Sequence, residues 1–287
     1  MKKYLHGTRG GLLLGTIGII VLSPDSLLLR LFSGDDLTIT AGRAAAMAVV
    51  LAIMLLLVAN LRAGFRWWPV LLYAAVYGLG LICFPLSIRH TFVANTLVIL
   101  ATSPLWAAIG GRIFLGEIVP RRTWLASIAA AVGVALVFAP QTTSGGLFGD
   151  ILALGVAFSL AGCAIIIRRY PQTNMFPGLC AAATAVALLF LPFADWQLPA
   201  RDFVIIAANG GVILPIAFVC IIAASRRLPP AEINLLFLLE TVLAPLWVWL
   251  VLAERPPLAA MLGGGLILIV LTAHSLATLR ALRRARE

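Results

Sequence analysis

The chain has 287 residues, of which 62% are hydrophobic and only 11% are charged. Soluble domains carry about 45–50% apolar and about 25% charged residues, so this composition excludes an ordinary soluble protein. A net charge of +10 would favour nucleic-acid binding in a soluble chain. Here the basic residues lie in short gaps between apolar runs, as Arg121 with Arg122 and Arg226 with Arg227 do. That pattern is typical of cytoplasmic loops facing anionic lipid, so the expected partner is a lipid bilayer and no nucleic acid.

Apolar stretches of about twenty residues follow one another along the chain, and each is bounded by charge, Gly or Pro. The first follows MKKYLHGTRGG, and we interpret it as a retained span and not as a cleaved signal. Ten spans are predicted, at residues 10–32, 37–60, 68–88, 91–114, 122–139, 147–169, 174–193, 202–225, 230–252 and 258–279. The connections are short, so consecutive helices are expected to run antiparallel and to pack as neighbours.

The distribution of basic residues predicts the orientation. With the N-terminus in the cytoplasm, sixteen of the 21 Lys and Arg residues fall on the cytoplasmic side: Lys2, Lys3, Arg9, Arg62, Arg66, Arg112, Arg121, Arg122, Arg168, Arg169, Arg226, Arg227, Arg280, Arg283, Arg284 and Arg286. The remaining five, Arg30, Arg43, Arg89, Arg201 and Arg255, lie outside or within the membrane. This bias predicts a multi-pass protein of the cell inner (plasma) membrane with both termini in the cytoplasm.

An internal repeat appears when the sequence is shifted by 137 positions, which places the segment from Ser87 on the segment from Ala224. The superposed pairs are Arg89 on Arg226, Asn95 on Glu232, Ser103 on Glu240, Glu117 on Glu254 and Pro120 on Pro257. An odd number of spans in each half inverts the second half relative to the first, which is an architecture of secondary transporters. The predicted fold is therefore an all-α integral membrane protein of ten transmembrane helices, with two five-helix inverted-topology repeats at residues 1–140 and 141–287.

The segment SPLWAAIGGRIFLGE from Ser103, followed by Trp124 and Gly133, resembles the first signature of the EamA-type drug/metabolite transporter superfamily. The segment from Glu240 to Glu254 resembles the second, and the resemblance covers nearly the whole chain. The Ser23-Pro24-Asp25 break and the run ETVLAPLW are most similar to the YddG-like amino-acid exporter branch. The resemblance implies alternating-access export of aromatic and other neutral amino acids around a midplane cavity. Other metabolites or cationic drugs are the alternative cargo within the superfamily.

Glu240 is the first candidate for function because it lies near the middle of the ninth span, where a carboxyl group is costly to insert. It could recognise a solute amino group or act as a proton-linked switch, since burial favours the neutral acid. The structural interpretation is a carboxyl that joins two helices. Asp25 and Arg43 are expected at similar depths. A gate is one interpretation of this pair, and a static pair between two helices is the favoured one.

The predicted solute-binding residues come from the third, fourth, eighth and ninth spans: Tyr77, Asn95, Ser103, Trp106, Asn209, Asn234, Glu240 and Trp247. Capping and interhelical hydrogen bonds are the ordinary explanation for Asn95 and Asn234. The glycine pairs Gly78 with Gly80 and Gly210 with Gly211 indicate either close packing, which we favour, or a wall that flexes.

The four cysteines lack metal-ligand spacing and the Gly-rich segments lack a phosphate-loop context, so neither a metal nor another cofactor is expected, and ATP-driven pumping is not supported. An intramembrane lipid-modifying enzyme, with Glu240 and Asp25 as acid and base, is the rival from another class. It is disfavoured because the two carboxyls are expected at different depths. A channel-like facilitator is not separated from a carrier by sequence. A monomer that binds a small-molecule substrate is the expected working unit.

Overall fold

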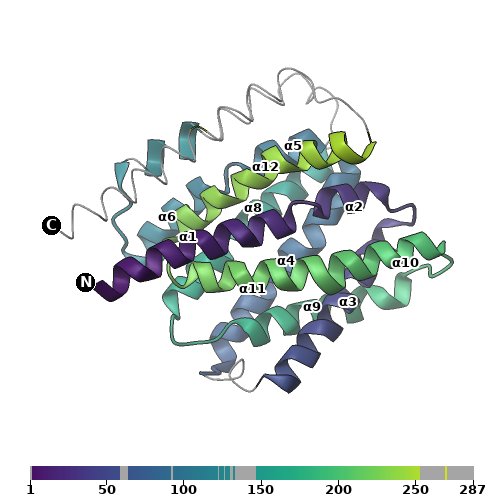
Figure 1. Cartoon of the computed structure of the whole chain (residues 1–287), viewed down its shortest axis with the longest axis horizontal. Coiled ribbons are helices and arrows are strands. Elements are labelled where there is room, and N and C mark those ends of the chain that lie inside the picture. The colour runs from purple at the N-terminus through teal and green to yellow at the C-terminus, as the bar shows by residue number, and fades with distance from the viewer. Residues whose placement is uncertain are drawn as a thin grey trace.

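The computed structural model describes residues 2–58, 64–91, 93–121, 123–125, 127–129, 132, 147–252 and 269. Its regular elements are helices throughout this part of the chain (Figure 1). They are α1 (Lys2–Leu22), α2 (Asp25–Leu31), α3 (Asp36–Leu57), α4 (Trp67–His90), α5 (Val93–Leu100), α6 (Ser103–Leu115), α8 (Leu147–Arg169), α9 (Phe176–Phe190), η3 (Leu191–Phe193), α10 (Ala200–Ile206), η4 (Ala207–Ile213), α11 (Leu214–Ser225) and α12 (Pro230–Leu252).

Six helical segments of the described chain are long and apolar enough to cross a membrane: Gly10–Leu31, Asp36–Leu57, Trp67–His90, Leu147–Arg169, Phe176–Phe193 and Ala200–Ser225. They coincide within a few residues with six of the predicted spans. The predicted fourth span is divided into α5 and α6, and the ninth is α12. The fifth span falls only partly within the described residues and the tenth almost wholly outside them, so the ten-helix count and the inverted repeat remain predictions.

Three spans depart from a continuous α-helix. The first is interrupted at Ser23-Pro24, and the fourth at Ala101-Thr102, two residues before Pro104. The eighth passes through a π-helical turn, η4, just before Pro215. Proline removes a backbone donor and clashes with the preceding turn, which accounts for interruptions at these positions. The predicted break at Ser23-Pro24-Asp25 is therefore present.

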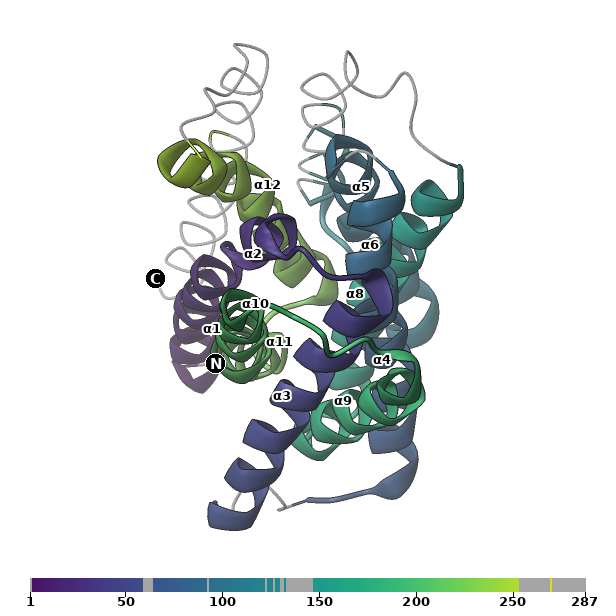
Figure 2. The same cartoon turned by 90° about the vertical axis from the view of Figure 1, so that its right-hand side faces the viewer.

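The two halves of the sequence interleave. α1 packs along α11 and α12, α4 along α8 and α9, α3 against α9, and α6 against α12. Figure 2 shows α1, α2, α10, α11 and α12 on one side of the molecule and α4, α5, α6, α8 and α9 on the other, with α3 between them. We call these two sets the first and second helix groups. Every pairing named here joins residues before 140 to residues after 147, so neither half is a separate body.

Contacts between connections divide the helix ends into two sets. At one end, the Arg226 guanidinium donates from Nη2 to the Pro171 carbonyl oxygen (2.8 Å), and Arg168 pairs with Glu117 (Nε–Oε1, 2.8 Å). We call this the basic end, because it carries Arg66, Arg121, Arg168, Arg169, Arg226 and Arg227. The predicted cytoplasmic loops of the described chain meet here.

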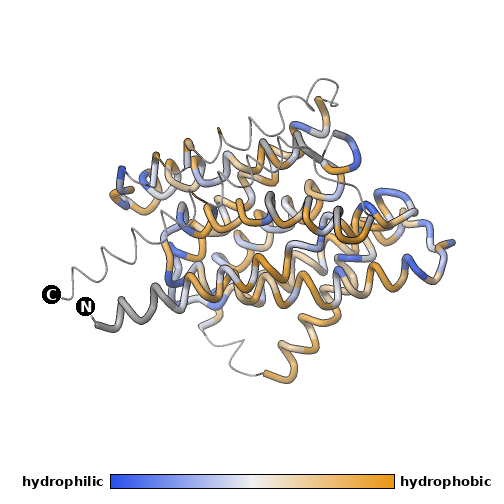
Figure 3. The backbone as a smooth tube through the Cα atoms, turned by 45° about the horizontal axis from the view of Figure 1, so that its top comes forward, coloured by the Kyte–Doolittle hydropathy of each residue, from blue (hydrophilic) through white to orange (hydrophobic). Residues whose placement is uncertain are grey.

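At the opposite end, the Asp195 backbone N–H donates to Thr38 Oγ1 (2.8 Å), and Ser33 Oγ donates to Asp202 Oδ2 (2.5 Å). Arg89 and His90 both pair with Asp36. We call this the acidic end, because Asp35, Asp36, Asp150, Asp195 and Asp202 gather there. Figure 3 shows the most hydrophilic stretches at helix ends and connections, with hydrophobic colour along the helices. This distribution fits a multi-pass membrane protein.

Candidate functional site

A cavity lies between the two helix groups and is lined by α1, α2, α3, α4, α5, α8, α11 and α12. It comprises about 740 Å³ of space, including the open space at its mouth. Most of its wall is apolar. Its polar and ionisable side chains are Asp25, Arg43, Tyr73, Tyr77, Ser159, Cys163, Ser225 and Glu240. An apolar cavity with a few convergent polar groups is the usual form of a small-molecule site.

A buried ion pair forms one part of the wall. Arg43 on α3 donates from Nη2 to Asp25 Oδ2 at 3.0 Å, and both side chains are at most 3% exposed. Asn209 in η4 donates from Nδ2 to the other oxygen, Asp25 Oδ1, at 2.5 Å. Asp25 reaches this place because α2 begins at that residue, directly after the Pro24 break. The expected pairing of Asp25 with Arg43 is thus present, while its role as a gate stays a prediction.

Backbone packing fixes the position of Arg43. A Cβ atom at Gly210 would overlap backbone atoms of Arg43, so only glycine lets η4 come this close to α3. Asn209, the neighbour of Gly210, is thereby brought to Asp25. The predicted close packing at this glycine pair is present at Gly210, whereas a Cβ at Gly211 would meet only Val50, at 3.9 Å.

Glu240 lines the same cavity from α12 and is 5% exposed. Asp25 and Glu240 therefore share one cavity. The different membrane depths expected for the two carboxyls stay a prediction.

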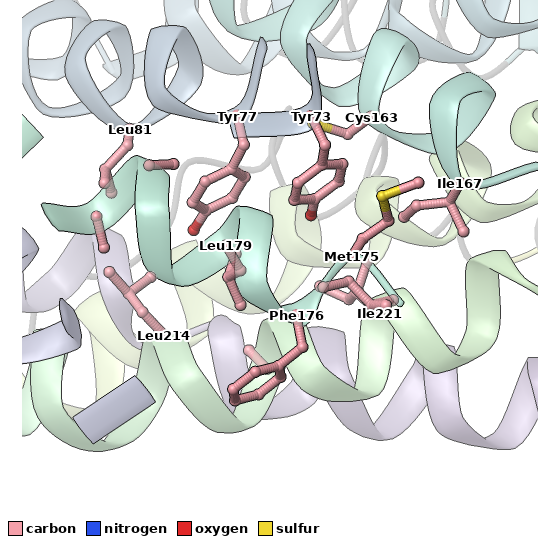
Figure 4. Close-up of a cluster of buried hydrophobic side chains, with 14 of the residues drawn as sticks. Tyr73, Tyr77, Leu81, Cys163, Ile167, Met175, Phe176, Leu179, Leu214 and Ile221 are labelled. Carbon is pink, nitrogen blue, oxygen red and sulfur yellow. The ribbon is translucent and has the colours of Figure 1, made fainter. Parts of the chain in front are cut away.

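Aromatic side chains supply much of the remaining wall. Tyr73 and Tyr77 project side by side from α4, with ring planes 3° apart and centroids 5.9 Å apart (Figure 4). Tyr77 meets Phe218 of α11 edge to face at 4.8 Å between centroids. Phe84 lies 6.0 Å from the Arg43 guanidinium carbon. Such a wall can bury an apolar or aromatic solute group.

Similarity to known proteins agrees with this architecture. Residues 147–275 match the EamA-like transporter family. The matched region begins with α8, contains α12 with Glu240, and extends beyond the described part of α12. Asp25 and Arg43 lie outside it.

Curated relatives cover more of the chain than the EamA-like region alone. Pseudopaline exporter CntI of Pseudomonas aeruginosa is 26% identical over 214 residues, 72% of this chain and 75% of the exporter. A riboflavin transporter of Vibrio cholerae is also 26% identical over 214 residues, 71% of this chain and 70% of the transporter. These names support the coarse prediction of a transporter and leave the amino-acid exporter branch as a prediction.

A crystal structure of another protein shares the fold. It superposes with a TM-score of 0.79 at 17% sequence identity, covering 94% of this chain and 98% of that protein. Similarity at this level of identity concerns the fold alone.

The predicted solute-binding residues divide into three sets. Tyr77 and Glu240 line the cavity. Asn209 is not a lining residue in the described chain but donates a hydrogen bond to Asp25, which is. In the described part of the chain, the cavity is not lined by Ser103, Trp106, Asn234 or Trp247. The side chain of Asn95 lies outside what the structure describes.

Three members of the second set, Trp106, Trp247 and Asn234, have local hydrogen-bond partners. Trp106 donates from Nε1 to Thr102 Oγ1 (3.0 Å), and Trp247 donates from Nε1 to Ser23 Oγ (2.7 Å). Asn234 donates from Nδ2 to the Pro230 carbonyl oxygen at 2.9 Å. Ser103 is buried at 1% exposure.

The α8 face of the cavity was not expected from the sequence. Val156, Ser159, Leu160, Cys163, Ala164 and Ile167 line it. These residues recur at intervals of three and four, the spacing of one helix face. Small or weakly polar side chains on that face could have pointed to a cavity, because they leave space beside the helix.

Proposed function

We propose that the chain is a secondary transporter that exports small organic solutes, with aromatic and other neutral amino acids as the preferred class. The observation that carries the proposal is the composition of the cavity. It combines an apolar and aromatic wall with a buried base and two acids, Arg43, Asp25 and Glu240. A neutral amino acid presents the matching groups, an apolar side chain together with one positive and one negative charge.

The roles follow from chemistry. Tyr73, Tyr77 and Phe218 offer aromatic surface for the solute side chain. Glu240 offers a carboxyl group to the solute ammonium in a low-dielectric setting, where charge-assisted hydrogen bonds are strong. Movement of the first helix group against the second would expose the cavity to one membrane face and then the other. The proposed location is the cell inner membrane, with the basic end facing the cytoplasm.

A different metabolite is the second candidate for the cargo, and the named relatives favour it, since one is a riboflavin transporter and another a pseudopaline exporter. One observation favours the alternative of an intramembrane lipid-modifying enzyme, namely that Asp25 and Glu240 line the same cavity. However, both Asp25 oxygens accept hydrogen bonds, from Arg43 and Asn209. A carboxylate so engaged is a poor general base, which supports transport over catalysis.

The test is counterflow in liposomes that contain the purified protein. Vesicles preloaded with unlabelled phenylalanine are expected to accumulate labelled phenylalanine in a saturable way. Glu240→Gln is expected to raise the phenylalanine concentration that gives half-maximal counterflow by roughly tenfold or more, since a charged hydrogen bond contributes about 1.5–3 kcal/mol. Glu232→Gln, on the same helix but outside the cavity lining, is the matched control and should resemble the unmodified protein.

Labelled riboflavin is run in parallel. Exchange of riboflavin without phenylalanine would retain the transporter and refute the amino-acid cargo. Linear, non-saturable flux would indicate a channel-like facilitator. Absence of flux across a wider panel of metabolites would refute the proposed function.

A further inference from the structure

Within the part of the chain that the structure describes, the Arg43 guanidinium is paired through one nitrogen. Nη2 donates to Asp25, whereas Nε and Nη1 are buried and have no hydrogen-bond partner among these residues. Arg43 lines the cavity and is 2% exposed. The free donors therefore belong to a buried cation at the wall of the proposed solute site.

Buried donors of a charged group are costly when unpaired, and close to all such groups in proteins find a partner. The protein does not supply one for Nε or Nη1 in the described chain. A solute that brings a hydrogen-bond acceptor to Nε and Nη1 would therefore gain affinity, and one without an acceptor would leave both donors unpaired.

Asp25 does not occupy all the hydrogen-bond donors of the Arg43 guanidinium. Its Oδ1 accepts from Asn209, and its Oδ2 takes the single bond from Arg43. Guanidinium groups can bind a carboxylate through two parallel hydrogen bonds. The bond to Asn209 holds Asp25 in a one-bond arrangement and leaves the other guanidinium donors available.

We propose that Arg43 is the carboxylate-binding residue of the cavity, and that Asp25 with Asn209 are positioning residues that hold its guanidinium there. The inference rests on the proposed transport function and narrows the substrate class to solutes that carry a carboxylate beside an apolar group. Phe84 and Tyr77 then lie on the side of the apolar group. A site with buried donors discriminates strongly against analogues lacking the acceptor.

The first experiment uses the unmodified protein in liposomes and measures competition against labelled phenylalanine counterflow. The competitors are phenylalanine, phenylalaninamide, which lacks the carboxylate, and 3-phenylpropionate, which lacks the ammonium. Phenylalaninamide is expected to compete about tenfold or more weakly than phenylalanine. 3-Phenylpropionate is expected to compete measurably, because it retains the group that Arg43 binds.

The second experiment compares Arg43→Lys with Arg89→Lys. Lysine keeps a positive charge for Asp25 but lacks the guanidinium, so Arg43→Lys is designed to fold while losing the free donors. Its preference for phenylalanine over phenylalaninamide should fall to near one. Arg89 pairs with Asp36 at the acidic end, outside the cavity, so Arg89→Lys should keep the full preference. If Arg43 had a merely structural role, Arg43→Lys would lower the apparent affinities for phenylalanine and phenylalaninamide by the same factor, and their ratio would not change.

Thermal-shift measurements on the purified protein separate this inference from the function. Stabilisation by 3-phenylpropionate that is lost in Arg43→Lys, without any flux, would retain the carboxylate site and refute transport. Riboflavin exchange that carboxylates do not inhibit would retain transport and overturn the role of Arg43. Equal competition by phenylalanine and phenylalaninamide would also overturn it.

Discussion

At the scale of single residues, the amide of Asn209 is the group that holds Asp25. Asn209 is fully buried and donates to Asp25 at 2.5 Å. Asn209→Ala removes this charged hydrogen bond and should lower the free energy of unfolding by about 1.5–3 kcal/mol. Thermal unfolding in detergent would register the loss. Gln197→Ala, at an exposed loop position, is the control and should leave the midpoint unchanged. An unaltered midpoint in Asn209→Ala would show that the bond contributes little.

Sequence reasoning recovered some of these residues and missed others for a physical reason. Asp25 and Arg43 could be paired because unpaired charges inside a membrane are costly. Glu240 stood out for the same reason. Trp106 and Trp247 do not line the cavity of the described chain, and their role stays a prediction, since composition does not give the rotation of a helix about its axis. The free donors of Arg43 depend on where Asn209 lies, and only the folded chain shows that.

At the scale of elements, the first and fourth spans have the same pattern of side-chain hydrogen bonds at their breaks. Ser23 donates from Oγ to the Ile20 carbonyl oxygen (2.7 Å), and Thr102 donates from Oγ1 to the Ile99 carbonyl oxygen (2.6 Å). Each hydroxyl also accepts from a tryptophan indole, Trp247 or Trp106. The Ile20 carbonyl lacks its usual backbone donor because the residue four positions later is Pro24, and inside a membrane such a carbonyl requires another donor, which the Ser23 hydroxyl provides. The Ile99 carbonyl also accepts from the Thr102 backbone N–H (3.0 Å), so the Thr102 hydroxyl is a second donor to it.

Removal of one indole tests this pattern of hydrogen bonds. Trp247→Phe keeps an aromatic ring but loses the donor to Ser23, and should lower the free energy of unfolding by about 1 kcal/mol. Trp106→Phe should behave similarly at the second break. Trp196→Phe, whose ring stacks on Phe203 near the surface, is the matched control. Equal midpoints in thermal unfolding for all three variants would contradict a stabilising role of the indoles.

The approach of η4 to α3 provides a second test at this scale. A Cβ at Gly210 would overlap the Arg43 backbone, whereas one at Gly211 meets only Val50 at 3.9 Å. Gly210→Ala should cost about 1–3 kcal/mol through overpacking and displace Arg43. Gly211→Ala should be neutral or slightly stabilising, because alanine favours helix. Unfolding midpoints and phenylalanine counterflow would be compared. Similar behaviour of the two variants would refute tight packing at Gly210.

At the scale of the whole molecule, hydrophobic periodicity and charge predicted the spans and the sides of the loops better than they predicted the residues of the site. The six apolar segments match predicted spans, and the loops of the described chain gather at two ends as an alternating topology requires. α1 packs along α11 and α4 packs along α8, so the two halves of the described chain interleave. A repeat in sequence indicates correspondence between helices. It does not predict that breaks occur at Ser23-Pro24 and Ala101-Thr102 while α8 and α12 run unbroken.

The orientation of the two ends can be tested with a matched pair of glutamines. Gln172 is exposed in the α8–α9 loop at the basic end, and Gln197 is exposed between α9 and α10 at the acidic end. Basic loops are retained in the cytoplasm. A membrane-impermeant maleimide added to intact cells should therefore label Gln197→Cys, and should label Gln172→Cys only after permeabilisation. The four native cysteines lie within helices, where two are buried and two are partly exposed, so the unmodified chain gives the background. Reversed labelling would place the basic end outside. Labelling of both variants in intact cells would contradict the alternating topology itself.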